Sequence, residues 1–336
     1  MVFVTGGTGL LGSHLLVELV QQHDQITAIY RNKSKIDTVK RCFEFYLKDE
    51  AATYFKRITW RECDVLDIPT LEEELQGHKI VYHCAAIVSF AKRDFQHMME
   101  INRHGTANIV NLSLDLGIEK FCFASSTSAV GKKDVPDDVE VDENGQWILT
   151  EETSGYAVTK YSAEKEVWRG MNEGLNVVIV NPSVIIGAGN WEESSMRIFK
   201  TISKGLKFYS PGANAFVDAR DVAKIMVNLV NSEIVNERFL CIGENAKFKR
   251  LFDLIAQELN QKPPTKKVHP VLMGITWRLS VLWSVLTFTK PLITKSAANN
   301  AFSTTKYSNQ KIKKAIGYEF HSLEESVKNA VKGRLN

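Results

Sequence analysis

The chain has 336 residues, of which 44% are hydrophobic, and this composition excludes a disordered protein. Its length allows one large domain or two modest ones around a substantial core. The net charge is only +3 and the basic residues are spread along the chain, which argues against the concentrated basic face of a nucleic-acid-binding protein.

The N-terminus predicts a strand, a glycine-rich turn and a helix, in that order. Residues 2–4 are β-formers typical of a strand buried on both faces of a parallel sheet, and apolar residues recur at helical spacing from Leu10. Gly6, Gly9 and Gly12 lie at the junction, where backbone N–H groups at a helix N-terminus can hold a pyrophosphate. Their G-x-x-G-x-x-G spacing differs from the commoner G-x-G-x-x-G, so a purely structural turn remains open at this point.

Short apolar strands alternate with helices along the first half of the chain. Strands are predicted at 25–31, 57–64, 79–86, 120–126, 175–187 and 238–243, and helices at 98–117 and 155–171. This alternation predicts a doubly wound α/β fold with a parallel sheet. Beyond about residue 182 the alternation becomes irregular, so we expect a second lobe built from interleaved segments.

Tyr156 and Lys160 are four residues apart on a predicted helix, so their side chains project from one face. The segment Ser-Ser-Thr at 125–127 is expected at the C-terminal end of a strand, where open α/β folds place their ligands. An ammonium beside a phenol favours the phenolate and would lower the tyrosine pKa. A serine hydroxyl could then hold a carbonyl or alcohol oxygen while the tyrosine passes the proton. Taken alone, the pair is also compatible with a solvated helix surface.

The order of these motifs resembles that of the extended short-chain dehydrogenase/reductases, which are NAD-dependent epimerase/dehydratase-like proteins. The segments that match are TGGTGLLG at 5–12, CDVLD at 63–67, HCAA at 83–86, NRHGTANI at 102–109, SST at 125–127, YAVTK at 156–160, NPSVIIG at 181–187 and FVDARDVA at 216–223. The resemblance covers roughly the first 225 residues and implies that the glycine loop binds a dinucleotide.

The resemblance also implies a division of the chain into two lobes. A Rossmann-type dinucleotide-binding domain would comprise residues 1–181 with returning segments at about 216–243. A smaller, mostly C-terminal substrate-binding lobe would comprise residues 182–215 and 244–336.

The same resemblance implies a catalytic set. Tyr156 would be the general acid/base, and Lys160 would lower its pKa and hold the nicotinamide ribose. Ser126 would orient the substrate, with Thr127 as the alternative, and Asn102 would shape the active site and its proton relay.

A larger set of residues would contact the cofactor through the glycine loop, the strand ends and the catalytic helix. These residues are Thr5, Gly6, Thr8, Gly9, Leu10, Gly12, Arg31, Asp64, Val65, Ala85, Ala86, Tyr156, Lys160, Pro182 and Ser183. Arg31 stands near the end of the second strand, where an NAD-preferring site usually carries a carboxylate for the ribose. Because a guanidinium pairs well with a 2′-phosphate, we expect NADP as the cofactor, with NAD and a merely basic surface turn as alternatives.

Departures from the family pattern favour a reductase. Thr127 and Ser128 stand where dehydratases carry an Asp-Glu pair, Val130 stands where epimerases carry an aromatic residue, and Asn181 replaces an arginine. This pattern is similar to the dihydroflavonol 4-reductase and 3β-hydroxysteroid dehydrogenase branches. The expected reaction is hydride transfer to a ketone, or from the matching secondary alcohol, on a mainly apolar small molecule.

Two other functions stay open: a nucleotide-sugar epimerase, and a non-catalytic NAD(P)-binding redox sensor or scaffold. An acidic stretch at 132–152 is a candidate lid and a poor cradle for a diphosphate. Several aromatic residues could line an apolar pocket, namely Trp147, Trp191, Phe199, Trp277 and Trp283. Four basic residues favour the sugar nucleotide instead, namely Arg197, Lys200, Lys204 and Lys207.

The segment 271–294 is apolar but is interrupted by Arg278 and Lys290, so it is not expected to be a transmembrane segment. It predicts one or two helices that line an apolar pocket, make peripheral contact with a membrane or form an ordinary buried pair. The eight histidines lack a recognisable ligand spacing, so we expect no metal. Five cysteines without a C-x-x-C pair favour a reducing, cytoplasmic setting. The resemblance further implies a homodimer formed through the helices near 98–116 and 156–171.

Overall fold

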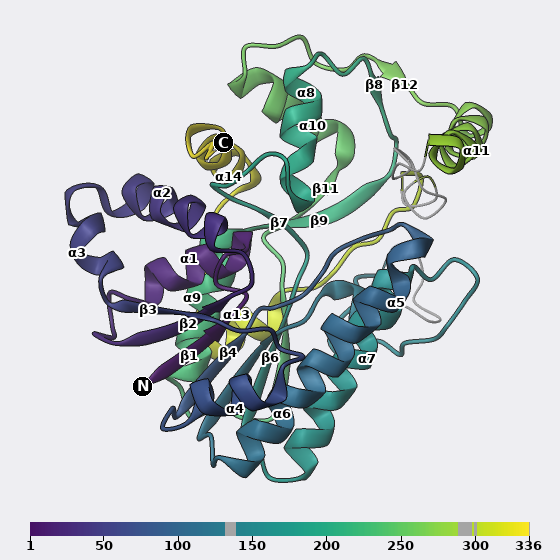
Figure 1. Ribbon diagram of the computed structural model, residues 1–336. Helices are drawn as coiled ribbons and strands as arrows, with labels where there is room; N and C mark the ends of the chain where they lie inside the picture. The colour runs from purple at the N-terminus through teal and green to yellow at the C-terminus, as the bar shows by residue number, and fades with distance from the viewer. Residues whose placement is uncertain (132–138, 288–297, 299–300, 336) are drawn as a thin grey trace.

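The computed structural model describes residues 1–131, 139–287, 298 and 301–335. A seven-stranded parallel sheet forms its centre, in the order β10-β6-β5-β4-β1-β2-β3 (Figure 1). Its strands are β1 (Val2–Thr5), β2 (Ile26–Tyr30), β3 (Ile58–Glu62), β4 (Ile80–His83), β5 (Lys120–Ala124), β6 (Val177–Pro182) and β10 (Glu237–Cys241). The strand order reverses between β1 and β4, which places the glycine loop at the switch point of a Rossmann-type fold. The predicted doubly wound sheet is confirmed.

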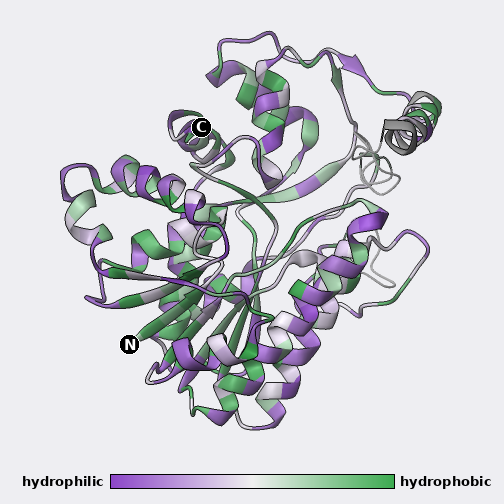
Figure 2. Ribbon diagram, viewed as in Figure 1, coloured by the Kyte–Doolittle hydropathy of each residue, from purple (hydrophilic) through white to green (hydrophobic). Residues whose placement is uncertain are grey.

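Helices cover both faces of this sheet, which explains why the strands at its centre are mainly apolar. Val2 and Val4 pack into one core with α1 (Leu10–Leu19) and α9 (Ala219–Val230). Phe3 points to the opposite core, as the two-residue period of a strand requires. Figure 2 shows hydrophobic strands in the middle and hydrophilic residues on the outer helix surfaces.

The other helices of this domain are α2 (Ile36–Leu47), α3 (Ala51–Phe55), α4 (Ile68–Leu75), α5 (Phe95–Met98), α6 (Gly105–Asp115), α7 (Gly155–Asn172) and α13 (Gln310–Ile316). The smaller lobe contains a sheet of β7 (Val184–Ile186), β9 (Ala213–Asp218) and β11 (Glu244–Lys247), with α8 (Arg197–Ser203), α10 (Phe248–Glu258) and α14 (Leu323–Lys332). A two-stranded ladder of β8 (Phe208–Tyr209) and β12 (Lys266–Lys267) leads to α11 (Pro270–Thr287). The exact division between the lobes stays a prediction.

Three elements differ from the sequence prediction. The segment 175–187 forms two strands, because the chain leaves the central sheet after β6 and β7 joins the smaller sheet. The third strand ends at Glu62, before Asp64 turns the chain by accepting a hydrogen bond from the N–H of Leu66 (3.0 Å). The helix predicted at 98–117 is α5 and α6 joined by one π-helical segment, Met99–His104. Residues 288–294 of the predicted apolar helices lie outside the described residues.

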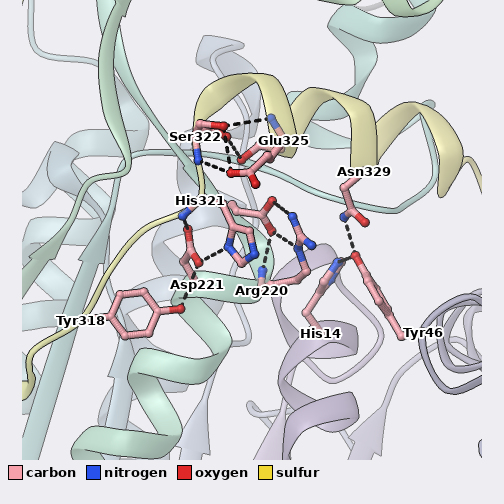
Figure 3. Close-up of polar contacts among 11 residues, drawn as sticks. His14, Tyr46, Arg220, Asp221, Tyr318, His321, Ser322, Glu325 and Asn329 are labelled. Carbon is pink, nitrogen blue, oxygen red and sulfur yellow. Dashed lines mark hydrogen bonds and ion pairs between the residues drawn. The ribbon is translucent and has the colours of Figure 1, made fainter.

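Asp221 of α9 fastens the C-terminal segment to the first domain (Figure 3). Its fully buried carboxylate accepts hydrogen bonds from the hydroxyl of Tyr318 (2.9 Å) and from the backbone N–H of His321 (3.1 Å). The His321 ring nitrogen Nδ1 lies 2.5 Å from the same carboxylate, and this hydrogen bond raises the pKa of His321. A protonated imidazole therefore stabilises the contact.

A second set of contacts ties α14 to α1 and α2. The hydroxyl of Tyr46 accepts a hydrogen bond from Asn329 Nδ2 (2.6 Å) and lies 3.0 Å from His14 Nε2 (Figure 3). Ser322 and Glu325 form a reciprocal capping box that begins α14. The C-terminal helix is thus anchored on α1 and α2.

Candidate active site

Ser126, Tyr156 and Lys160 meet beside the carboxyl end of β5. Ser126 follows that strand by two residues, and Ser154 caps α7 by accepting a hydrogen bond from the N–H of Ala157 (3.1 Å). Tyr156 therefore lies in the first turn of α7, with Lys160 one turn further along the same face. The Ser126 side chain lies close enough to Tyr156 to lower the pKa of the phenol. The three predicted catalytic groups are brought together.

Lys160 is 2% exposed and its Nζ donates a hydrogen bond to the carbonyl of Ala124 (2.7 Å). The same ammonium lies 4.6 Å from the centre of the Phe123 ring. Burial lowers the pKa of Lys160 to about 8, an effect that the charge of Glu164 opposes. These contacts with β5 hold the ammonium next to the C-terminal end of the strand.

The pKa of Tyr156 differs from the sequence-based expectation. Desolvation raises it above the ordinary value, and the nearby Ser126 hydroxyl opposes the rise. The side chain is half-buried, with Phe90 at an edge-to-face distance of 6.0 Å.

Asn102 is 1% exposed and lies in the π-helical segment, a distortion frequent at functional sites. Its Oδ1 accepts a hydrogen bond from the N–H of Ile87 (2.7 Å), and its Nδ2 donates to the carbonyl of Ile87 (2.9 Å). Nδ2 also donates to the Thr159 hydroxyl (2.9 Å). Asn102 thus fixes the loop that follows β4, including Ala85, against α7.

The glycine loop packs too closely at Gly6 and Gly12 to accept side chains there. Gly6 has φ +69°, and a Cβ there would lie 2.5 Å from the backbone nitrogen of Ala85. A Cβ on Gly12 would lie 2.1 Å from the carbonyl oxygen of Gly6. Gly9 is the N-cap of α1 and has no side chain to accept hydrogen bonds from the first-turn N–H groups. Those N–H groups and the positive end of the helix dipole fit a pyrophosphate.

His83 contacts the start of this loop through Thr5. It is fully buried, its Nδ1 lies 2.6 Å from the Thr5 hydroxyl and its Nε2 lies 2.9 Å from the Thr106 hydroxyl. Burial, reinforced by the positive charge of Lys160, lowers the pKa of His83 to about 3. The imidazole is therefore neutral, and Thr5 in turn accepts a hydrogen bond from the N–H of Ala85 (3.2 Å).

The ends of β2 and β3 carry the two charged residues predicted for the adenosine end. Arg31 NH1 lies 3.7 Å from Asp64 Oδ2, and the two side chains are 49% and 38% exposed. Val65 is buried beside Gly105, and its carbonyl accepts a hydrogen bond from Asn108 (3.0 Å). This end of the site is open to solvent.

The remaining predicted residues lie along the same edge of the sheet. Thr8 and Leu10 lie in the glycine turn and at the start of α1, Ala86 lies in the loop after β4, Pro182 is the last residue of β6, and Ser183 follows it. The backbone N–H of Ser183 donates a hydrogen bond to the carbonyl of Cys241 (3.2 Å).

Sequence reasoning missed a buried carboxylate beneath the catalytic group. Glu164 is 2% exposed, and its Oε2 accepts hydrogen bonds from Ser125 Oγ (2.6 Å) and Asn181 Nδ2 (2.7 Å). Its Oε1 accepts from Arg238 (2.9 Å) and Trp168 (3.2 Å). The available signal was its spacing, since Glu164 lies one turn after Lys160 on the same face of the helix.

Part of the predicted acidic lid has a different role. Glu143 is 9% exposed, and its Oε1 accepts a hydrogen bond from the N–H of Leu240 in β10 (2.8 Å). Its carbonyl also accepts a hydrogen bond from Arg238 Nε (2.9 Å). Glu143 is therefore tied to the central sheet, whereas Asp134, Asp137 and Asp138 lie outside the described residues.

Two of the predicted pocket aromatics, Trp191 and Phe199, are buried in the core of the smaller lobe and do not line a pocket. Trp147 stacks on Tyr161 at 4.0 Å and donates a hydrogen bond to the carbonyl of Ser128 (3.2 Å). Other apolar side chains that precede Tyr156 in the sequence are exposed, namely Val88, Phe90, Phe95, Ile148 and Leu149. Of these, Phe90 contacts the Tyr156 ring.

A polar cavity of about 510 Å³ lies elsewhere, lined by Glu18, Arg220, Lys224 and His321 among others. It contains none of the predicted catalytic residues. Within the described ranges, no cluster of three or more His, Cys, Asp or Glu side chains could hold a metal ion. In the same ranges, no helix has the length and apolar character needed to cross a membrane.

Comparisons with known proteins agree with this fold. The chain is 27% identical over 274 residues to sterol demethylase protein B of Methylococcus capsulatus, covering 80% of this chain and 78% of that protein. It is 31% identical over 226 residues to a putative dihydroflavonol 4-reductase of Synechocystis, covering 66% of this chain and 60% of that protein. The crystal structure of UDP-glucose 4-epimerase from Thermotoga maritima shares the fold, with a TM-score of 0.76, 20% identity and coverage of 99% and 97%.

The model of the NAD dependent epimerase/dehydratase family matches residues 2–243. This match covers the glycine loop, the catalytic helix and all seven strands of the central sheet. The protein therefore belongs to the NAD-dependent epimerase/dehydratase family, within the extended short-chain dehydrogenase/reductases, and is an NAD(P)-binding oxidoreductase.

Proposed function

We propose that this protein reduces a ketone, or oxidises the matching secondary alcohol, on a mainly apolar small molecule. The observation that carries the proposal is the hydrogen bond from Lys160 Nζ to the carbonyl of Ala124 (2.7 Å), which joins the helix of Tyr156 to the strand end that Ser126 follows. This arrangement provides a donor for a substrate oxygen, a proton source and a nearby positive charge.

Each residue has a defined role in the proposed reduction. Ser126 donates a hydrogen bond to the carbonyl oxygen and fixes its position beside the Tyr156 hydroxyl. The nicotinamide supplies a hydride to the carbonyl carbon when the cofactor is bound. Tyr156 transfers its proton to the oxygen, and the positive charge of Lys160 stabilises the phenolate that remains. Oxidation of the alcohol uses the same groups in reverse.

An exposed aromatic side chain beside Tyr156 supports an apolar substrate. Small-molecule sites are mainly apolar with a few placed polar groups, which matches the exposed side chain of Phe90 next to the Tyr156 ring. The names of two relatives, which mention a sterol and a dihydroflavonol, point in the same direction.

NADP is the cofactor that we propose, because Arg31 presents an exposed guanidinium at the end of β2. Its partner Asp64 is 3.7 Å away and half-exposed, so the pair is loose enough to admit a phosphate. NAD remains the alternative cofactor for the same binding site.

Nucleotide-sugar epimerisation is the second candidate. Four cations in and near α8 favour it, but Lys200 among them is already paired with Glu192. A non-catalytic redox sensor or scaffold is the third candidate, and the presence of all three catalytic groups argues against it.

A panel of aromatic and steroid-like ketones, their alcohols and UDP-sugars, assayed through reduced nicotinamide absorbance, tests the proposal. We expect cofactor-dependent turnover of apolar ketones or alcohols. Conversion of a UDP-sugar with no response to any apolar carbonyl would establish the epimerase instead. Cofactor binding without turnover of any compound would favour the sensor.

We also propose a cytoplasmic homodimer that pairs through α6 and α7. The five free cysteines are compatible with a reducing compartment. Closed two-fold dimers are the commonest assembly of such proteins. Light scattering at micromolar concentration should report twice the chain mass, and a monomer would contradict the prediction.

A further inference from the structure

Helix α11 carries a stripe of exposed apolar side chains. Val271, Ile275, Leu279 and Trp283 follow one another at four-residue intervals and are 65%, 51%, 60% and 65% exposed. Four residues advance about 40° beyond one turn of an α-helix, so the stripe covers an arc of about 120°. Figure 1 shows α11 at the edge of the smaller lobe, apart from the other labelled helices. An apolar face of this size on a surface helix indicates an interaction site.

The sequence around this helix is basic throughout. Between Glu258 and Glu319 the chain has ten lysines and arginines and no acidic residue, whereas the rest of the chain has more acidic than basic residues. Lys266 and Lys267 are exposed in β12, directly before α11. Arg278 is exposed within the helix, with its guanidinium 4.8 Å from the centre of the Trp277 ring. The apolar stripe is thus bordered by cations.

We propose that α11 lies in the interface of a lipid bilayer that contains anionic headgroups. Leu279 and Trp283 would enter the boundary between headgroups and acyl chains, as the apolar faces of interfacial helices do. Lys266, Lys267 and Arg278 would attract the anionic headgroups. Since no helix among the described residues can cross a membrane, the protein would rest on the bilayer.

The charge pattern favours an anionic bilayer over a second copy of the chain as the partner of α11. Pairing two α11 helices through their apolar faces would also bring together two basic segments, which repel each other. An anionic bilayer supplies the opposite charge to both. The proposal is independent of the reaction, because none of its residues belongs to the catalytic set.

Cosedimentation of the full-length chain with vesicles tests the proposal. Phosphatidylcholine vesicles with and without about one-third phosphatidylserine would be compared for the wild type, for Ile275→Asp with Leu279→Asp, and for Lys266→Gln with Lys267→Gln. The matched control is Ile68→Asp with Val235→Asp, which places two charges at other exposed apolar positions, 47% and 37% exposed. Thermal unfolding of each variant shows whether it folds.

We expect at least a tenfold preference of the wild type for the anionic vesicles. The α11 variant should lose binding, the lysine variant should weaken it and added salt should reduce it, while the control binds like the wild type. Equal binding to both vesicles, no binding, or equal loss in the control would overturn the proposal. An α11 variant that instead changes the oligomeric state, without any vesicle binding, would assign the stripe to a second copy of the chain.

Discussion

The two ends of the cofactor edge are built differently. At the catalytic end, Lys160, Glu164 and Asn102 are at most 2% exposed, and each has partners within hydrogen-bond distance. At the proposed adenosine end, Arg31 and Asp64 are 49% and 38% exposed, and a 3.7 Å contact joins them. The first end holds its groups in fixed positions, whereas the second leaves them free to exchange partners.

We expect this difference to divide two tasks, proton transfer at one end and the choice between NAD and NADP at the other. Proton transfer requires groups placed within hydrogen-bond reach of the substrate, so buried and hydrogen-bonded side chains suit the catalytic end. Recognition of a ribose or a 2′-phosphate requires a few side chains at a solvent-exposed edge, where one substitution can change the preference. Substitutions at the catalytic end should therefore change turnover and stability, whereas substitutions at the other end should change cofactor affinity.

The largest effect is expected for Tyr156→Phe. Loss of the hydroxyl should lower kcat by about 10²–10⁴-fold, because the proton source disappears while the ring remains. Cofactor affinity should stay almost unchanged. The control is Tyr161→Phe on the same helix, whose ring stacks on Trp147 and should keep doing so. Steady-state kinetics with isothermal calorimetry checks both values, and near-normal turnover in the Tyr156 variant would exclude the mechanism.

The next effect is expected for Glu164→Ala, measured as the free energy of unfolding in denaturant. This change leaves Arg238 without its buried partner and should cost about 3–5 kcal/mol. Glu166→Ala, two residues along the same helix, breaks surface pairs with Arg103 and Arg169 and should cost about 1 kcal/mol or less. Equal costs would mean that the buried network does not stabilise the catalytic end.

A smaller effect is expected for Arg31→Ala. NADP affinity should fall by about tenfold to a hundredfold, equivalent to the 1.5–3 kcal/mol of a hydrogen bond to a charged group. NAD affinity should change little, and Lys33→Ala should leave both unchanged. Calorimetric titration with the two oxidised cofactors measures this, and undiminished NADP binding in the Arg31 variant would contradict the assignment.

The smallest effect is expected for His321. Its side chain is partly exposed, unlike the buried groups of the catalytic end. Its pKa is raised by the hydrogen bond with Asp221. A raised pKa in the folded state means that its stabilisation is complete below the ordinary histidine value near 6.5 and is lost as pH rises through the folded value.

The free energy of unfolding, obtained from thermal unfolding, should therefore decrease across that pH range more for the wild type than for His321→Gln. The difference should be less than about 1 kcal/mol, as for other partly exposed pairs. His97→Gln is the control, since His97 is a surface residue beside Glu100. Parallel curves for the wild type and the His321 variant would show that the contact does not depend on protonation.

Local patterns predicted the sheet, the glycine loop and the meeting of Ser126, Tyr156 and Lys160, because strand period and helical spacing are local properties. They did not predict the role of Glu164, whose partners Ser125 and Arg238 are 39 and 74 residues away. The break after Pro182 was also missed, since apolar residues continue on both sides of it while the strand partners change. Long-range pairing decides such features, and it leaves no local signal.

The position of β10 has a consequence for synthesis. β6 (Val177–Pro182) is entirely buried in the finished protein, and one of its two neighbours, β10, begins only at Glu237. During translation, the hydrogen-bonding edge of β6 therefore stays unpaired until more than 50 further residues have been made. Open apolar edges recruit other strands, and pairing across such sequence separation is slow. A chaperone that covers this edge should raise the yield of folded protein, and truncation before β10 should produce aggregates.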